Sequence, residues 1–240
     1  MSVYGTVKRI YKIVVPNHIR RWLFSVTPYP LKRIRNHAIR ILEKTAEHDE
    51  IYDIDFYDET REIYMANSID VIAGSIVEVF SPKSVVDAGC GTGSLLLALK
   101  ERGISCEGLE YSKAAIDICV RRGLKVTRFD LERDIIPPDL RADVVVSTEV
   151  AEHLPNDCAD HFVDILCTIA DTVVMTAAEP KPGALGTDHV NEQPNEYWIK
   201  KFSIRGYTYD ESLSQQWRMK WRENKIAAFY ASTVMVFKRT

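Results

Sequence analysis

The sequence predicts an α/β fold in which a mostly parallel sheet is covered by helices on both faces. Short apolar runs alternate with helix-length amphipathic segments from residue 68 to residue 180, a pattern typical of parallel strands joined by crossover helices. Three glycines follow the first apolar run in "VVDAGCGTG", at the carboxyl edge of the sheet, where such folds bind their ligands. These two observations predict both the architecture and the place of a ligand site.

The expected elements follow one another in a regular order. The apolar spacing of 68–80 indicates a helix. Strands are expected at 84–89, 104–112, 124–132 and 171–180, and a further strand runs into the start of a helix at 143–154. Helices are expected at 94–103, 113–123 and 158–170, the first two ending at a glycine.

The last part of the chain changes character. A short amphipathic helix is expected to begin at residue 195, in "NEYWIKKF". The segments "GYTYDE" (206–211) and "AFYASTVMVFKR" (228–239) have the composition of strands. We expect these two strands to close the sheet as an antiparallel pair.

Cysteine usage and hydropathy predict a cytoplasmic protein. The five cysteines are an odd number and form no Cys-x-x-Cys pair, which argues against a disulfide framework or a zinc site. No apolar run reaches the length needed to span a membrane, and the N-terminal region lacks the uninterrupted apolar core of a signal peptide.

The first 44 residues carry a strong positive charge, with ten Lys and Arg against one acidic residue, Glu43. Apolar residues recur beside the basic ones at roughly helical spacing. Two interpretations stay open: a solvated arm packed on the domain, or a basic amphipathic anchor for an anionic membrane surface or another polyanion. We therefore divide the chain into a helical, basic N-terminal extension (1–45) and a globular domain (46–240).

The glycine turn predicts close approach of a ligand to bare backbone. Gly89, Gly91 and Gly93 can adopt positive φ angles. Their spacing, G-C-G-T-G, differs from the G-x-G-x-x-G of dinucleotide-binding turns. A nicotinamide-dependent dehydrogenase is therefore disfavoured.

Two acids extend the expected ligand edge. Glu110 ends the second strand, where a carboxylate can accept both hydroxyls of a ribose, and Asp130 ends the third, where a carboxylate can accept from an adenine amino group. Each could instead cap the helix that follows.

With these motifs in register, residues 66–240 resemble the class I S-adenosylmethionine-dependent methyltransferases. "VVDAGCGTG" is similar to their first motif, "GLEYS" to the ribose-binding segment, "FDLE" to the adenine-binding segment and "ADVVVSTEVAEHLP" to the fourth-strand motif. The resemblance implies a Rossmann-like sheet of seven strands whose last strand is antiparallel. It also implies S-adenosylmethionine as cofactor, with these residues at its site: Asp87, Gly89, Gly91, Gly93, Glu110, Asp130 and Leu131.

The segment "STEVAEHLP" predicts a second constellation. Glu149, Glu152 and His153 stand at i, i+3 and i+4, which would place them on one face of a helical turn. His189 lies in a later polar loop, "GTDHVNEQP". These four side chains could hold one divalent cation such as Mg²⁺ or Mn²⁺. A metal could lower the pKa of an acceptor hydroxyl, or His153 or His189, with Glu149 nearby, could act as the base without a metal. A purely structural role for the three residues of 149–153 is the remaining alternative.

E-x-x-E-H at this place also resembles two groups of metal-using methyltransferases: those of ubiquinone biosynthesis and those that methylate the 3′ end of small RNAs. The stretch 189–207 and the basic arm resemble, more loosely, methyltransferases of polysaccharide and glycan biosynthesis. These resemblances imply O-methylation of a sugar or another small polar hydroxyl acceptor near a membrane. An RNA 2′-O-methyltransferase is less favoured, because no RNA-binding module accompanies the motif. A non-catalytic protein that binds S-adenosylmethionine is the alternative from another functional class.

Overall fold

The computed structural model describes residues 59–180 and 189–240 of the 240-residue chain. The basic extension predicted over 1–45 lies outside the described residues, and the domain boundary at 45/46 stays a prediction. Within the described ranges, no helix combines the length and apolarity that crossing a bilayer requires.

Seven strands form one sheet in the order β3-β2-β1-β4-β5-β7-β6. The strands are β1 (Ser84–Ala88), β2 (Ser105–Glu110), β3 (Val126–Arg128), β4 (Val144–Thr148), β5 (Thr172–Thr176), β6 (Tyr207–Tyr209) and β7 (Met235–Arg239). The five strands from β3 to β5 pair in parallel, whereas β7 lies antiparallel between β5 and β6. The predicted Rossmann-like sheet with its antiparallel last strand is confirmed.

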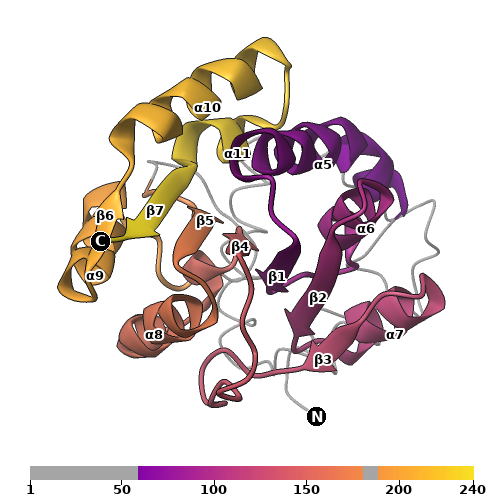
Figure 1. Ribbon diagram of the computed structural model, residues 1–240, viewed down its shortest axis with the longest axis horizontal. Coiled ribbons are helices and arrows are strands. Elements are labelled where there is room, and N and C mark those ends of the chain that lie inside the picture. Colours follow the sequence, from indigo (N-terminus) through magenta and orange to yellow (C-terminus); the bar gives the residue numbers. More distant parts are fainter. Residues whose placement is uncertain (1–58, 181–188) are drawn as a thin grey trace, which may run out of the picture.

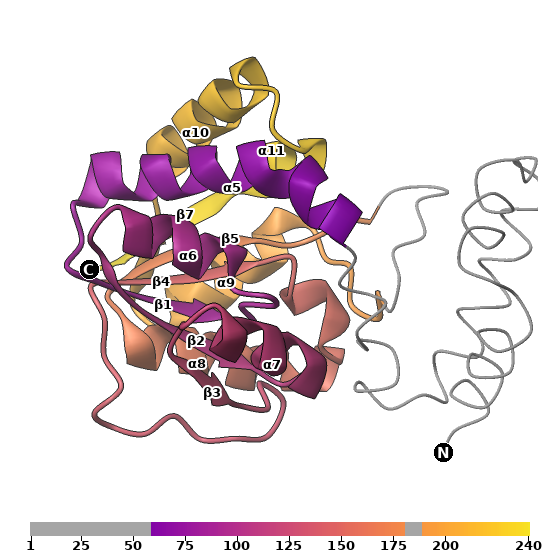
Figure 2. The ribbon, with the colours of Figure 1, turned by 90° about the vertical axis from the view of Figure 1, so that its right-hand side faces the viewer.

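The helices cover both faces of the sheet (Figures 1 and 2). They are α5 (Glu59–Phe80), α6 (Ser94–Glu101), α7 (Lys113–Arg121), α8 (Ala159–Ile169), α9 (Asn195–Ile204), α10 (Glu211–Glu223) and α11 (Ala228–Thr233). Two short 3₁₀ helices, η1 (Ala151–His153) and η2 (Asn156–Cys158), precede α8. Side chains of α5, α6, α10 and α11 form one apolar cluster with the sheet, which we call the α5 cluster, and those of α8 and α9 form a second, the α8 cluster. A third, smaller cluster joins α6 to α7.

The C-terminal region differs from the prediction in two respects. The segment 228–233, expected as the first half of a strand, is helix α11, and the strand begins only at Met235. Helix α10 was not predicted. Its buried face carries Trp217 and Trp221, which stack at a centroid distance of 5.4 Å in the α5 cluster.

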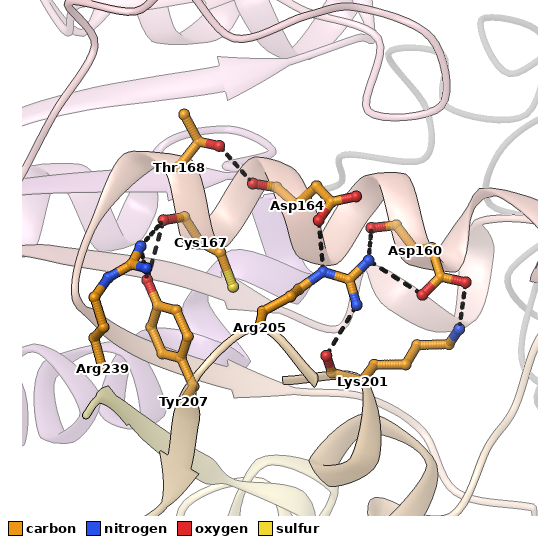
Figure 3. Close-up of polar contacts among 8 residues, drawn as sticks. All are labelled: Asp160, Asp164, Cys167, Thr168, Lys201, Arg205, Tyr207 and Arg239. Atoms are coloured by element: carbon orange, nitrogen blue, oxygen red, sulfur yellow. Dashed lines mark hydrogen bonds and ion pairs between the residues drawn. The ribbon is translucent and has the colours of Figure 1, made fainter. Parts of the chain in front are cut away.

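Arg205, at the end of α9, joins that helix to α8 (Figure 3). Its Nε donates to Asp164 at 2.5 Å, and one terminal nitrogen donates to the carboxylate and carbonyl oxygens of Asp160. Lys201, one turn earlier, also binds Asp160. The Arg205 side chain is only 16% exposed, so these contacts are better shielded than most surface ion pairs.

We expect Arg205→Ala to lower the free energy of unfolding by about 1–2 kcal/mol, because charge-assisted hydrogen bonds across two helices are lost. Urea denaturation measures the change. Lys220→Ala, which removes a more exposed pair with Glu78, is the control and should cost less than about 0.5 kcal/mol. Equal losses in the two variants would contradict a special role for Arg205.

Candidate active site

The glycine turn lies at the carboxyl end of β1. Its three positions need glycine for different structural reasons. All three have positive φ: +83° at Gly89, +54° at Gly91 and +77° at Gly93. A Cβ atom on Gly89 would come within 2.5 Å of a methyl group of Val150, and one on Gly93 within 2.4 Å of Leu124. At Gly91, by contrast, no described atom lies within 4 Å of that position. Packing therefore excludes side chains at the two outer glycines, and Gly91 borders open space.

Glu110 is tied to the glycine turn by its side chain. One carboxylate oxygen accepts the backbone N–H of Gly91 at 2.7 Å, and the other accepts that of Ser112 at 2.8 Å. Ser112 caps the N-terminus of α7. Glu110 thus joins the turn after β1 to the helix after β2. Ribose binding by Glu110 stays a prediction.

Asp87 is a buried acid on β1, next to the turn. Its side chain is 2% exposed, and its Oδ1 has no hydrogen-bond partner among the described residues. Burial raises the pKa of Asp87 from 3.8 to about 7, and the negative charge of Glu110 adds to the shift. Near neutral pH, ionised Asp87 therefore destabilises the ligand-free protein.

We expect Asp87→Asn to be more stable than the wild type at pH 8, by about 1–3 kcal/mol, and nearly equal to it at pH 4. The native pKa of Asp87 lies above its unfolded value, so between about pH 4 and 7 the native state keeps a proton that the unfolded state releases. Wild-type stability is therefore lost as the pH rises through this window. Urea denaturation of both proteins at pH 4 and pH 8 tests the expectation, and a pH-independent difference would contradict it.

Asp130 and Leu131 follow β3 on the same edge. One Asp130 carboxylate oxygen accepts the backbone N–H of Glu132 at 2.9 Å, so Asp130 stabilises the turn that follows it, where no helix begins. Leu131 is buried in the α8 cluster. Adenine binding by these two residues stays a prediction.

The "EVAEH" segment follows β4 in a different local conformation from the one expected. Glu149 has a φ angle of +56° and lies before the 3₁₀ turn Ala151–His153. The prediction that Glu149, Glu152 and His153 share one face of a single helical turn was therefore wrong. The left-handed residue at 149 redirects the chain between β4 and the turn.

The structure brings Glu152, His153 and His189 together. Candidate ligand atoms of these three side chains all lie within 4.8 Å of one another. The two imidazole rings meet edge to face, with centroids 4.8 Å apart. Glu149 lies outside this three-residue group but near enough to Glu152 for their charges to interact. We call Glu152, His153 and His189 the EHH group.

Segment 189–193 is docked onto η1 by main-chain contacts. The backbone N–H groups of Val190 and Asn191 both donate to the carbonyl oxygen of Glu152, at 2.9 and 3.0 Å. His189 Nδ1 lies 2.8 Å from a carboxylate oxygen of Glu192, a contact that orients the ring as carboxylates orient metal-binding histidines. Residues 181–188, which precede this segment, lie outside the described part of the chain.

Glu152 has an unusual environment. Its side chain is fully buried, and neither carboxylate oxygen has a hydrogen-bond partner among the described residues. Burial raises the pKa of Glu152 to about 8, and the charge of Glu149 adds to the shift. A cation would relieve this cost, and one carboxylate with two imidazoles is a donor set suited to divalent transition metals. The residues present therefore fit a metal ion.

Sequence reasoning missed two polar neighbours of the EHH group, Asn191 and Glu192. The only signal was the run "HVNEQP", polar and without periodicity. Such a run is equally typical of an ordinary surface loop.

Comparison with known proteins gives the family. A family model described as a methyltransferase domain matches residues 57–231. The chain is 26% identical over 102 residues to a magnesium-protoporphyrin O-methyltransferase of Synechocystis sp., a match that covers 40% of this chain and 44% of that protein. It is 39% identical over 84 residues to a trans-aconitate 2-methyltransferase of Rhodococcus jostii, covering 34% and 32%. It is 26% identical over 161 residues to a ubiquinone biosynthesis O-methyltransferase of Hahella chejuensis, covering 62% and 61%. The matched regions thus span less than two thirds of these relatives.

Solved structures share the fold. Magnesium protoporphyrin IX methyltransferase from Synechocystis with bound S-adenosylhomocysteine superimposes with a TM-score of 0.57 at 18% identity, over 74% of this chain and 84% of that one. The methyltransferase domain of bacterial CtHen1-C gives a TM-score of 0.53 at 17% identity, over 73% and 98%. Because the family model covers the glycine turn and the strands β1 to β6, the chain belongs to the methyltransferase-domain family.

Proposed function

We propose that this enzyme methylates a hydroxyl oxygen of a sugar or another small polar acceptor at the EHH group. The observation that carries the proposal is the convergence of Glu152, His153 and His189 within 4.8 Å, directly after β4 and one strand from the glycine turn. Two of the relatives named above are O-methyltransferases, which supports oxygen as the methylated atom. The looser likeness of 189–207 to glycan-associated methyltransferases supports a sugar.

The reaction requires the acceptor oxygen to lose a proton and attack the sulfonium methyl group. The new bond joins oxygen to the methyl carbon, the sulfur–methyl bond breaks, and its electron pair stays on sulfur to give S-adenosylhomocysteine. A divalent cation held by Glu152, His153 and His189 would lower the pKa of an acceptor hydroxyl. Without a cation, either imidazole can take the proton as a general base.

The described residues also position the reactants. Gly91 leaves open space at the carboxyl edge, where we place the methionine end of the cofactor. The pairing of Glu192 with His189 Nδ1 fixes one imidazole, and the contacts of 190 and 191 with the Glu152 carbonyl hold the whole segment in place. Holding donor and acceptor in line supplies a large part of the rate of such displacements.

Calorimetry tests the proposal. The wild type and Glu152→Ala are titrated with S-adenosylhomocysteine in EDTA, and with Mn²⁺ alone. We expect both proteins to bind S-adenosylhomocysteine and only the wild type to bind Mn²⁺. Cofactor binding without a Mn²⁺ site would leave His153 or His189 as a simple base, whereas a wild type that does not bind S-adenosylhomocysteine would contradict the placement of the cofactor.

A screen for release of S-adenosylhomocysteine then compares sugars with short RNAs. Turnover of RNA 3′ ends and not of sugars would replace the sugar by the RNA alternative.

For the basic residues 1–44 we propose a peripheral contact with anionic lipid, based on their charge. Co-sedimentation with phosphatidylglycerol vesicles, and its loss without residues 1–44, is the expected result.

A further inference from the structure

Asn191 is a buried amide with an unused donor beside the EHH group. The residue is 3% exposed, and its Nδ2 has no hydrogen-bond partner among the residues that the structure describes. Its Oδ1 accepts from Gln193 Nε2 at 2.9 Å, which fixes which end of the amide is used. A buried N–H group without a partner is costly and uncommon in native proteins.

The position of Asn191 is set by Glu152. The backbone N–H of Asn191 donates to the Glu152 carbonyl at 3.0 Å, and His189, two residues earlier, packs against His153. Both Glu152 carboxylate oxygens are themselves buried without a hydrogen-bond partner in the described ranges. The unused Nδ2 donor thus belongs to a buried residue that contacts Glu152 directly. It matches a ligand that offers an oxygen lone pair beside the EHH group.

We propose that Asn191 is an acceptor-binding residue whose Nδ2 donates to the oxygen next to the one that is methylated. The acceptor then carries two neighbouring oxygens, as in a vicinal diol of a sugar ring. This inference rests on the proposed function, because it assigns the reacting oxygen to the EHH group. It adds the substrate feature that the EHH group alone does not specify.

The chemistry favours the neighbouring oxygen over the reacting one. A hydroxyl oxygen has two lone pairs. During transfer one of them must point at the sulfonium methyl group, and an amide donor on the reacting oxygen would reduce its nucleophilicity. Nδ2 also cannot accept the proton that the reacting oxygen loses. A second, unreactive oxygen satisfies the amide and orients the sugar at the same time.

A matched pair of substrates tests the proposal. Methyl glycosides of hexoses and 6-deoxyhexoses are compared with analogues that lack one hydroxyl of each vicinal pair, and kcat/KM is measured from the release of S-adenosylhomocysteine. For the wild type we expect removal of the neighbouring hydroxyl to lower kcat/KM about tenfold, the worth of one hydrogen bond. In Asn191→Asp, which replaces the donor by an acceptor, the diol should lose about tenfold and the discrimination between the two substrates should disappear.

Two controls separate binding from damage. Asn224→Asp makes the same chemical change at the end of α10, where Asn224 is exposed and its amide has a partner; it should keep wild-type discrimination. If Asn191→Asp does not fold, Gln193→Ala releases the Asn191 amide from its fixed orientation and should weaken the discrimination. Affinity for S-adenosylhomocysteine should stay within about twofold in all folded variants.

Three outcomes would overturn the proposal. The first is wild-type discrimination retained in Asn191→Asp, which would leave Nδ2 with a water molecule as its partner. The second is equal turnover of the diol and its deoxy analogue by the wild type. The third is no turnover of any vicinal diol by a wild type that binds S-adenosylhomocysteine and Mn²⁺. Loss of cofactor binding by the wild type is a different result, since it would contradict the proposed function itself.

Discussion

His189→Ala is expected to leave the affinity for S-adenosylhomocysteine within about twofold and to reduce methyl transfer by about a thousandfold. The imidazole is lost from the EHH group, whether it binds a cation there or takes the acceptor proton. The cofactor motifs lie on other loops and keep their contacts, including the tie between Glu110 and Gly91. Calorimetry with S-adenosylhomocysteine measures the first quantity, and its release during turnover measures the second.

His161→Ala is the matched control for this prediction. His161 lies on α8, and its Nε2 is 3.0 Å from the carbonyl oxygen of Asp134, away from the EHH group. The control should keep wild-type activity. Full activity in His189→Ala would refute both the metal and the base assignments of His189.

Gly91→Val is expected to weaken S-adenosylhomocysteine binding by at least about a hundredfold while the protein stays folded. No described atom would contact the first added carbon, so the fold can accommodate the side chain. That space is where we place the methionine end of the cofactor. The positive φ of +54° adds a strain of about 1–3 kcal/mol for a β-branched residue. Calorimetry gives the affinity and thermal unfolding the stability.

Gly123→Val separates strain from occlusion. Gly123 follows α7, has a φ of +66°, and likewise has no described atom within 4 Å of its added Cβ. A similar loss of stability is expected there, with normal binding. If Gly91→Val binds S-adenosylhomocysteine like the control, the cofactor is not placed against Gly91.

The parallel part of the fold could be predicted from sequence because its signals are local. The strands β1, β4 and β5 are short, mostly apolar runs, and Gly103 and Gly123 mark helix ends with positive φ. The C-terminal error has a physical cause. "AFYAST" is rich in aromatic and β-branched residues that favour strands, yet it forms a helix whose Tyr230 and Ala231 pack into the α5 cluster.

The candidate site was predictable only as a list of residue types. The spacing of Glu149, Glu152 and His153 predicts a helical turn, but the left-handed conformation of Glu149 excludes it, and nothing in the letters E-x-x-E-H signals that conformation. Asn191 differs again, since its importance depends on burial and on a missing partner. Both properties exist only after the chain has folded.

Glu152 has two separate roles in one residue: its carbonyl oxygen anchors segment 189–193, and its side chain belongs to the EHH group. When segment 189–193 docks onto the Glu152 carbonyl oxygen, His189 therefore takes its place in the EHH group in the same step. The hydrogens on the amide nitrogens of Val190 and Asn191 should exchange slowly with deuterated solvent only while that event is complete. Their exchange rates, followed by mass spectrometry, then give the fraction of molecules with an assembled site, before any acceptor is known.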